Sequence, residues 1–126
     1  MRPKWYNQAL EDLEEGEEIQ KTYEIDCEKK FGYLILTNQK LRFYKQEGFL
    51  RKRYEKTFET KYDDIEHIND KKNRFRFTLT LRQHSHTYKF QSSSIPVNMI
   101  IKQIKERTTI NKPISHSVEA VAHQTD

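Results

Sequence analysis

The stretch RFRFTLTLR, residues 74–82, alternates apolar and polar residues with a period of two along its whole length. Its apolar members begin at Phe75 and end at Leu81. Because successive side chains of a β-strand point to opposite faces, this alternation predicts a strand with one face on a core and the other in water. The segment TYKFQ, residues 87–91, repeats the pattern after a polar QHSH. The two runs therefore predict an antiparallel hairpin.

Four earlier segments extend the predicted sheet. Residues 19–26 alternate in the same way, and residues 33–38 are apolar on both faces. Residues 40–45 place Leu41 and Phe43 on the core face and Lys40, Arg42 and Tyr44 on the other. Residues 49–60 carry Leu50, Tyr54 and Phe58 four apart, a spacing that fits a helix or alternate inward positions of a strand. Their aromatic and threonine content favours the strand.

The segment SSSIPVNMIIKQIKERT, residues 92–108, predicts an amphipathic helix. Serines provide N-terminal caps, and Pro96 stands near the first helical position, where its missing N–H has no cost. The apolar residues then recur at i, i+3, i+4 and i+7 and form one stripe. They are Val97, Ile100, Ile101 and Ile104. One apolar stripe on one helix predicts packing against one open face of a curved sheet.

The two ends of the chain differ from this central part. Trp5, Tyr6, Leu10 and Leu13 could line one side of a short helix that stops at Gly16, so residues 1–16 are predicted to be a helical lead-in. The Trp5-Tyr6 pair is a candidate anchor for a protein partner. Residues 109–126 lack periodicity and large apolar residues, which predicts a disordered tail. The domain proper is then expected over residues 17–108.

Composition restricts the possible classes of protein. The chain has 126 residues, a length typical of one domain, and a net charge of +4 that permits attraction to phosphate or anionic lipid without requiring it. The single cysteine, Cys27, cannot form an intrachain disulfide, which favours a reducing compartment. No apolar run approaches the roughly 20 residues of a membrane span. We therefore expect a cytoplasmic protein, with peripheral membrane association left open.

A family resemblance rests on GYLILTNQKLRFYK, residues 32–45, followed by FETKYDDIEHI, residues 58–68. This order resembles the GRAM and bacterial or archaeal PH-like domains, which combine a Gly, an apolar strand ending in Leu-Thr-Asn, a basic-Leu pair and a later segment like Ile-Pro-Tyr-x-Asp-Ile-x-x-Ile. Lys61 stands where that segment commonly has Pro. The acidic EEGEEI, residues 14–19, is similar to the Gly-Glu lead-in of many members. The resemblance spans residues 14–107.

The resemblance implies a mainly β fold, namely a seven-stranded, partly open PH-like barrel capped by one C-terminal amphipathic helix. It also implies a monomeric, non-catalytic binding module without a cofactor, recruited to anionic membrane lipid such as phosphoinositides. The alternative is a protein adaptor, for example a GLUE-type domain of ESCRT-like sorting that binds ubiquitin. Fold analogy alone does not choose between these ligands.

Basic residues near strand ends are the candidate ligands for a lipid headgroup, because a multivalent phosphate group needs several charge-assisted hydrogen bonds. The candidates are Lys29, Lys30, Lys40, Arg42, Arg51, Lys52 and Arg53. The second predicted strand, YLILT, carries no charge, which argues against the usual phosphoinositide signature of PH domains. Basic strand edges that only keep a protein soluble are an alternative interpretation.

Other functions have less support. Arg74, Arg76 and Arg82 could face nucleic acid, but the aromatic residues beside them are predicted to face the core, which disfavours base stacking. His84 and His86 have a spacing that could bind metal, yet no third ligand is placed by the sequence, so no metal site is assigned. No nucleophile motif or glycine-rich phosphate loop occurs, and no enzyme activity is expected.

Overall fold

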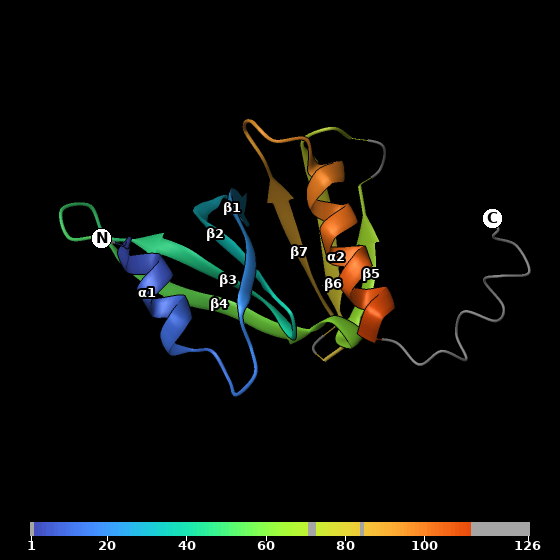
Figure 1. Ribbon diagram of the computed structural model, residues 1–126. Helices are drawn as coiled ribbons and strands as arrows, with labels where there is room; N and C mark the ends of the chain where they lie inside the picture. Colours follow the sequence, from blue (N-terminus) through green and yellow to red (C-terminus); the bar gives the residue numbers. More distant parts are fainter. Residues whose placement is uncertain (1, 71–72, 84, 112–126) are drawn as a thin grey trace, which may run out of the picture.

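A computed structural model describes residues 2–70, 73–83 and 85–111, with side chains up to Thr108. Within these ranges, seven strands form one antiparallel sheet in the order β4-β3-β2-β1-β7-β6-β5. In chain order the elements are α1 (Lys4–Glu11), β1 (Ile19–Cys27), β2 (Lys30–Thr37), β3 (Lys40–Glu47), β4 (Arg53–Lys61), the short 3-10 helix η1 (Tyr62–Asp64), β5 (Ile65–Asn69), β6 (Arg76–Leu81), β7 (His86–Gln91) and α2 (Val97–Asn111). Strands β4 and β5 form the two ends of this order, so the barrel is not closed (Figure 1). The predicted mainly β, partly open PH-like barrel is confirmed.

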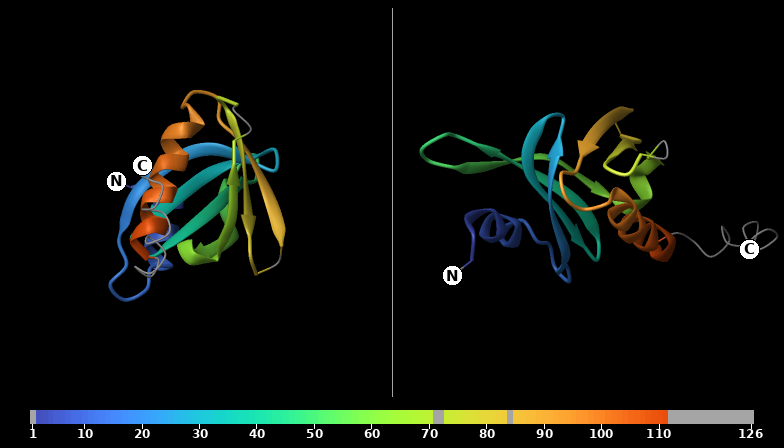
Figure 2. Two further views of the ribbon diagram at one scale, coloured as in Figure 1. Left: turned by 90° about the vertical axis from the view of Figure 1, so that its right-hand side faces the viewer. Right: turned by 90° about the horizontal axis from the view of Figure 1, so that it is seen from above.

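Strand β1 joins the two halves of the barrel. It pairs with β2 along almost its whole length but with β7 only at Asp26–Gln91 and Cys27–Phe90. The sheet therefore bends sharply at this corner, and the two halves face each other across the interior (Figure 2). At the opposite side η1 turns the chain from β4 into β5, and α2 lies beside η1. Helix α2 thus covers the face that the open barrel leaves exposed.

The inner face of the sheet holds the main core, as the alternation in β6 predicts. Phe77, Leu79 and Leu81 are buried, and the Phe77 ring stacks on Phe90 of β7 with centroids 4.8 Å apart. Phe75 was expected on the same face but precedes β6 and remains partly exposed. The alternation in the sequence begins before β6 does, because the pairing with β7 starts only at Arg76.

Helix α2 supplies the other wall of the core. The whole predicted stripe, from Val97 to Ile104, is buried against the inner face. The helix continues to Asn111, three residues past the predicted boundary at 108. The remainder of the predicted tail, residues 112–126, lies outside the described residues.

The outer face of β2 and β3 is also buried, which agrees with the apolar residues predicted on both faces of β2. Helix α1 packs on it and forms a second cluster, called here the outer cluster. Its members are Ala9, Tyr33, Ile35 and Tyr44, with Trp5, Ile19 and Tyr54 packed against them. The Trp5 ring is stacked on Tyr33 with centroids 4.1 Å apart. Trp5 therefore attaches α1 to the sheet, and this contact occupies the ring that was a candidate partner anchor.

A bulge in β1 explains why Ile19 belongs to the outer cluster. Strict alternation would place Ile19 on the same face as Tyr23 and Ile25, which contact the main core. The pairing with β2 shifts register between Ile19 and Lys21. An extra residue in one strand reverses the facing of everything before it, so Ile19 points outward.

The ambiguous segment 49–60 is a strand over most of its length, as predicted. Strand β4 begins at Arg53, however, so Leu50 lies in the connection between β3 and β4 and is not an inward strand position. The predicted inward role of Leu50 is wrong. Of the other two residues in the fourfold spacing, Tyr54 packs against the outer cluster and Phe58 is buried in the main core.

Adjacent residues of α2 provide a test of this packing. Ile100→Ala should lower the free energy of unfolding by about 2–5 kcal/mol, because Ile100 is fully buried and its truncation leaves a cavity. Met99→Ala should change it by less than about 1 kcal/mol, because Met99 is mostly exposed. Urea unfolding of both variants measures the difference. Equal losses for the two variants would contradict the placement of α2.

Candidate functional site

The segment between α1 and β1 is fastened to the turn between β2 and β3. The Asn38 side chain accepts a hydrogen bond from the Glu18 N–H (2.8 Å) and donates one to the Gly16 carbonyl (3.0 Å). The Gln39 side chain donates to the Glu15 carbonyl. Gly16 has φ +79°, a conformation that glycine adopts without strain. The acidic lead-in is therefore part of the folded domain.

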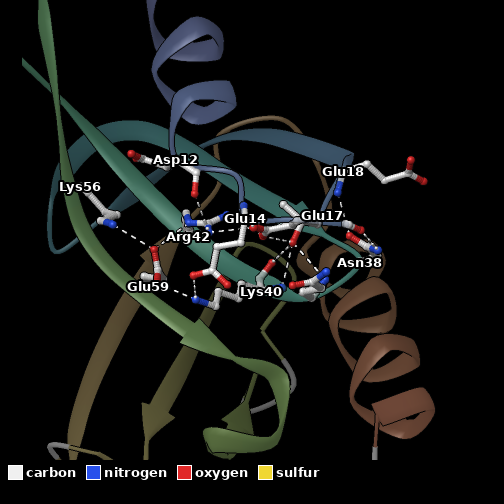
Figure 3. Close-up of polar contacts among 12 residues, drawn as sticks. Asp12, Glu14, Glu17, Glu18, Asn38, Lys40, Arg42, Lys56 and Glu59 are labelled. Carbon is white, nitrogen blue, oxygen red and sulfur yellow. Dashed lines mark hydrogen bonds and ion pairs between the residues drawn. The ribbon is translucent and has the colours of Figure 1, made fainter.

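Glu17 and Arg42 form a buried ion pair beneath this segment (Figure 3). Arg42 Nη1 lies 2.7 Å from Glu17 Oε2, and Nη2 lies 3.0 Å from Oε1, so the pair is bidentate. Neither side chain is accessible to solvent. Arg42 Nε donates in addition to Glu59 Oε1 on β4 (2.8 Å), and the Thr37 hydroxyl donates to Glu17. Each charge is thus matched by an opposite charge and by further hydrogen bonds.

This arrangement sets the protonation states of the pair. Burial alone would raise the pKa of Glu17, but hydrogen bonds from Arg42 and Thr37 outweigh it and the pKa is lowered. Burial opposes ionisation of Glu59 in the same way, yet the donors Arg42, Lys56 and Lys40 lower its pKa to about 2. Both carboxyl groups are therefore ionised at neutral pH.

Two residues proposed for a lipid site belong to this internal network. Arg42 has no accessible surface, and Lys40 bonds through Nζ to Glu14 and, at 3.0 Å, to Glu59. A headgroup cannot reach Arg42, and contact with Lys40 would have to compete with two carboxylates. We therefore leave both residues out of the candidate surface. No local pattern indicates the two carboxylates, because Glu17 and Glu59 are 25 and 17 residues from Arg42 along the chain.

The other five candidates lie at the opposite end of β2 and β3 from the turn that holds Asn38. Lys29 lies in the connection from β1 to β2, and Lys30 follows it as the first residue of β2. Arg51, Lys52 and Arg53 lie in the connection from β3 to β4 and at the first position of β4. Both connections are at one end because β2 and β3 are antiparallel, with Gly32 paired to Lys45. All five residues are exposed.

The start of α1 adds further positive charge to this end. Trp5 stacks on Tyr33, whose ring lies 5.9 Å from that of Tyr54 beside Arg53. The exposed Arg2 and Lys4 precede Trp5 along the chain, and Figures 1 and 2 show the N-terminus at the same end of the molecule as the β3–β4 connection. These two residues were not among the predicted candidates, because only the packing of α1 brings them to this end.

Acidic side chains near the same end are paired with a lysine. Lys45 Nζ lies 3.1 Å from Glu47 and 3.7 Å from Glu55. The hydrogen bond and charge of Lys45 lower the pKa of Glu47, and Arg53 and Lys30 add to the effect. The strand pairing places Gly32 opposite Lys45 and Arg53 opposite Glu47, so both basic connections lie beside this end of β3. We call Arg2, Lys4, Lys30, Arg51, Lys52 and Arg53 the basic end.

Two apolar residues at the basic end were not singled out from the sequence. Phe49 and Leu50, between the ends of β3 and β4, are 91% and 90% exposed. The pattern GFLRKR contains a signal for them, because two large apolar residues follow a glycine and precede three basic ones. Assigning Leu50 to a strand concealed it.

A hollow between β1, β7 and the start of β6 is a second candidate, with a volume of about 670 Å³. Phe77 and Phe90 are among its lining residues. Its charged lining residues are Asp26, Glu28, Lys29, Asp70, Arg76 and Lys89, three acidic and three basic. This balance favours neither an anionic nor a cationic ligand, so we do not assign Lys29 or the hollow to the candidate surface.

Cys27 and His86 differ in their exposure to solvent. Cys27 is buried, and burial together with Glu28 raises the pKa of its thiol to about 12, so it is protonated at neutral pH. His86 is exposed on β7, while His84 lies outside the described residues. The predicted pairing of these two histidines is therefore not described by the structure.

Comparisons with known proteins support the fold. No family model matches the chain, and a search of curated proteins finds no match. Among solved structures, the chain is similar to the C-terminal domain of an unknown protein from Leishmania infantum, with a TM-score of 0.58 and 17% identity. The match covers 82% of this chain and 94% of that domain. At this identity the likeness concerns the fold alone.

The helices also bear on membrane association. Among the described residues, neither α1 nor α2 nor η1 has the length and apolar character needed to cross a bilayer.

The buried ion pair makes a first prediction for this region. Arg42→Met should destabilise the fold by about 3–5 kcal/mol, because it leaves Glu17 buried without its counter-charge. Lys56→Met is the matched control: it removes the more exposed partner of Glu59 and should cost less than about 1 kcal/mol. Urea unfolding monitors both. A loss below 1 kcal/mol for Arg42→Met would contradict a structural role for the pair.

The same network predicts acid sensitivity. The folded-state pKa of Glu59 is about 2 against an ordinary value of 4.5, and that of Glu17 is also lowered. A carboxyl group whose pKa is depressed by folding contributes stability above its unfolded pKa, and this stability is lost as the pH falls through the folded value. The melting temperature should therefore decrease between about pH 4.5 and pH 2. Glu59→Gln should flatten this decrease, and an unchanged slope in that variant would show that the network does not cause it.

Proposed function

We propose that this chain is a non-catalytic, PH/GRAM-like binding module that associates with anionic membrane surfaces through its basic end. The observation that supports the proposal is the gathering of exposed cationic side chains from three separate chain segments. These are the start of α1, the β1–β2 connection and the β3–β4 connection. By contrast, the basic residues Lys40 and Arg42 within β3 are committed to internal ion pairs.

Electrostatics makes such a surface effective at a membrane. Each Lys or Arg near an anionic leaflet contributes about 1 kcal/mol of attraction, and six of them can act together on one patch of lipid. The contribution is screened by salt, because exposed charges interact over about one Debye length. The binding should therefore weaken steeply with ionic strength.

The arrangement favours recognition of surface charge over recognition of one headgroup. Gly32 to Thr37 of β2 carry no charge and are buried on both faces, so Lys30, at the start of β2, is the one basic residue that this strand offers to a headgroup. The basic side chains are spread along an edge and do not line the hollow as a single-sign pocket. We accordingly infer that phosphatidylserine and phosphoinositides bind according to their charge.

Neutralisation of the β3–β4 connection tests the proposal. The variant R51Q/K52Q/R53Q should bind anionic vesicles about 100-fold more weakly, as the loss of three contributions of about 1 kcal/mol each requires. The matched control K21Q/K102Q/K105Q removes the same charge from exposed positions of β1 and α2 and should bind nearly as the wild type does. Liposome co-sedimentation over a range of salt concentrations measures both. If the two variants lose vesicle binding equally, binding depends only on net charge, and the proposal that the basic end is the binding surface is wrong.

The protein-adaptor alternative, including ubiquitin binding, stays a prediction and has a separate outcome. If the wild type fails to bind anionic vesicles even at low salt, the lipid proposal is wrong, and a ubiquitin pull-down becomes the decisive assay. Heparin or single-stranded RNA at matched charge tests the nucleic-acid alternative. If the protein prefers these polyanions to vesicles, the basic end is a nucleic-acid-binding surface.

A further inference from the structure

The connection between β3 and β4 combines two features that rarely occur together on the surface of a folded domain. Phe49 and Leu50 are adjacent, large and apolar, and they are 91% and 90% exposed. The other exposed large apolar residues of the described chain are Phe31, Phe75 and Met99, at 40%, 38% and 55%. Only at Phe49 and Leu50, among the described residues, is almost an entire apolar side chain in water.

The backbone around this pair is tightly turned. Gly48 has φ +89°, and a Cβ built on it would lie 2.2 Å from the Arg51 carbonyl oxygen. Gly48 and Arg51 are therefore in close backbone approach, with Phe49 and Leu50 between them at the apex. A side chain at position 48 would be strained twice, by its φ and by this contact. The glycine permits a turn that carries the two apolar side chains away from the sheet.

The apex also projects beyond the rest of the molecule. Figure 2 shows the β3–β4 hairpin extending away from the body of the barrel in the view from above, and Figure 1 shows it on the side opposite α2. Strands β3 and β4 remain paired as far as Glu47 and Arg53, so the projection is a supported two-stranded arm. A tip on such an arm can penetrate a surface that the barrel itself only touches.

The charges next to the apex identify the kind of surface. Arg51, Lys52 and Arg53 follow directly, and all three are exposed. An apolar tip followed by cations is complementary to the interface of an anionic bilayer, where acyl chains lie just beneath a layer of negative headgroups. A tip of two side chains is small compared with the roughly 800 Å² that each partner buries in a stable protein interface. The geometry therefore fits a lipid surface better than a protein partner.

We propose that Phe49 and Leu50 insert into the acyl region of an anionic membrane, while Arg51, Lys52 and Arg53 bind the surrounding headgroups. This inference rests on the proposed function and specifies its mode: the chain does not adsorb by charge alone but is anchored by an apolar wedge. The basic end supplies attraction and orientation, and the wedge supplies a contribution to binding that salt does not screen.

Depth of insertion provides the direct test. The chain has one tryptophan, Trp5, so W5F/F49W carries a single fluorescent probe at the apex. On vesicles of phosphatidylcholine with a minority of phosphatidylserine, its emission should shift to shorter wavelength and be quenched by lipids brominated on the acyl chains. The control W5F/M99W places the probe at an exposed apolar position of α2 and should show neither effect.

Binding measurements with F49S/L50S separate the inference from the proposed function. The variant should bind these vesicles roughly 100-fold more weakly than the wild type at about 0.15 M salt and at low salt alike, because salt does not screen the apolar contribution that is lost. At low salt the remaining charges should still hold most of the protein on the vesicles. M99S is the matched control and should bind normally at both salt concentrations. If F49S/L50S equals the wild type at every salt concentration and F49W is not quenched, the wedge is wrong and charge-based recruitment stands.

Two further outcomes would also overturn the inference. Absence of wild-type binding to the vesicles at low salt would remove the proposed function and the wedge together. Concentration-dependent dimerisation of the wild type in analytical ultracentrifugation, abolished in F49S/L50S, would assign the apex to a second copy of the chain in place of a membrane.

Discussion

The buried ion pair between Glu17 and Arg42 is the interaction on which the outer half of the structure depends. An arginine on the outer face of β3 would ordinarily remain in water, and its burial is costly unless its charge is matched and its donors are satisfied. The lead-in segment satisfies it through Glu17 and the Asp12 carbonyl, and β4 contributes Glu59. Burial of Arg42 therefore requires that residues 12–17 lie across the sheet, which in turn positions α1 on the outer cluster.

The covering of the outer face by α1 and residues 12–17 also determines where charged side chains are exposed on the surface. Because α1 and the lead-in cover the outer face, and α2 covers the inner one, neither face of β2 and β3 offers a broad polar surface. Exposed cations are left at the strand ends, and the packing of Trp5 on Tyr33 brings the start of α1 to the same end. Two residues of the segment that resembles PH-like domains, Thr37 and Asn38, have a structural role in this arrangement. Thr37 and Asn38 hold the Gly-Glu lead-in through hydrogen bonds, so these positions contribute to folding.

Elements with a strict pattern could be predicted from the sequence, and those that depend on distant partners could not. The alternation of β6 and the stripe of α2 each bury one continuous face, so periodicity alone identified them. Ile19 was misplaced because a bulge, set by pairing with β2, changes the phase of the alternation. Leu50 was misplaced because the start of β4 depends on its pairing with β3 and not on the spacing of its apolar residues.

The sequence by itself determined the mainly β fold class, the helix that covers the barrel, and part of the set of exposed basic residues, namely Lys30 and Arg51 to Arg53. Local pattern and composition are sufficient for these, since they depend on near neighbours along the chain. Only the tertiary structure decided which cations are free for a ligand. Arg42 and Lys40 have the same charge as Arg51 and Lys52, but contacts over 17 to 26 residues bury the first two among carboxylates and leave the others exposed beside Phe49 and Leu50. Burial and pairing are properties of the folded chain, and they separate a structural charge from an available one.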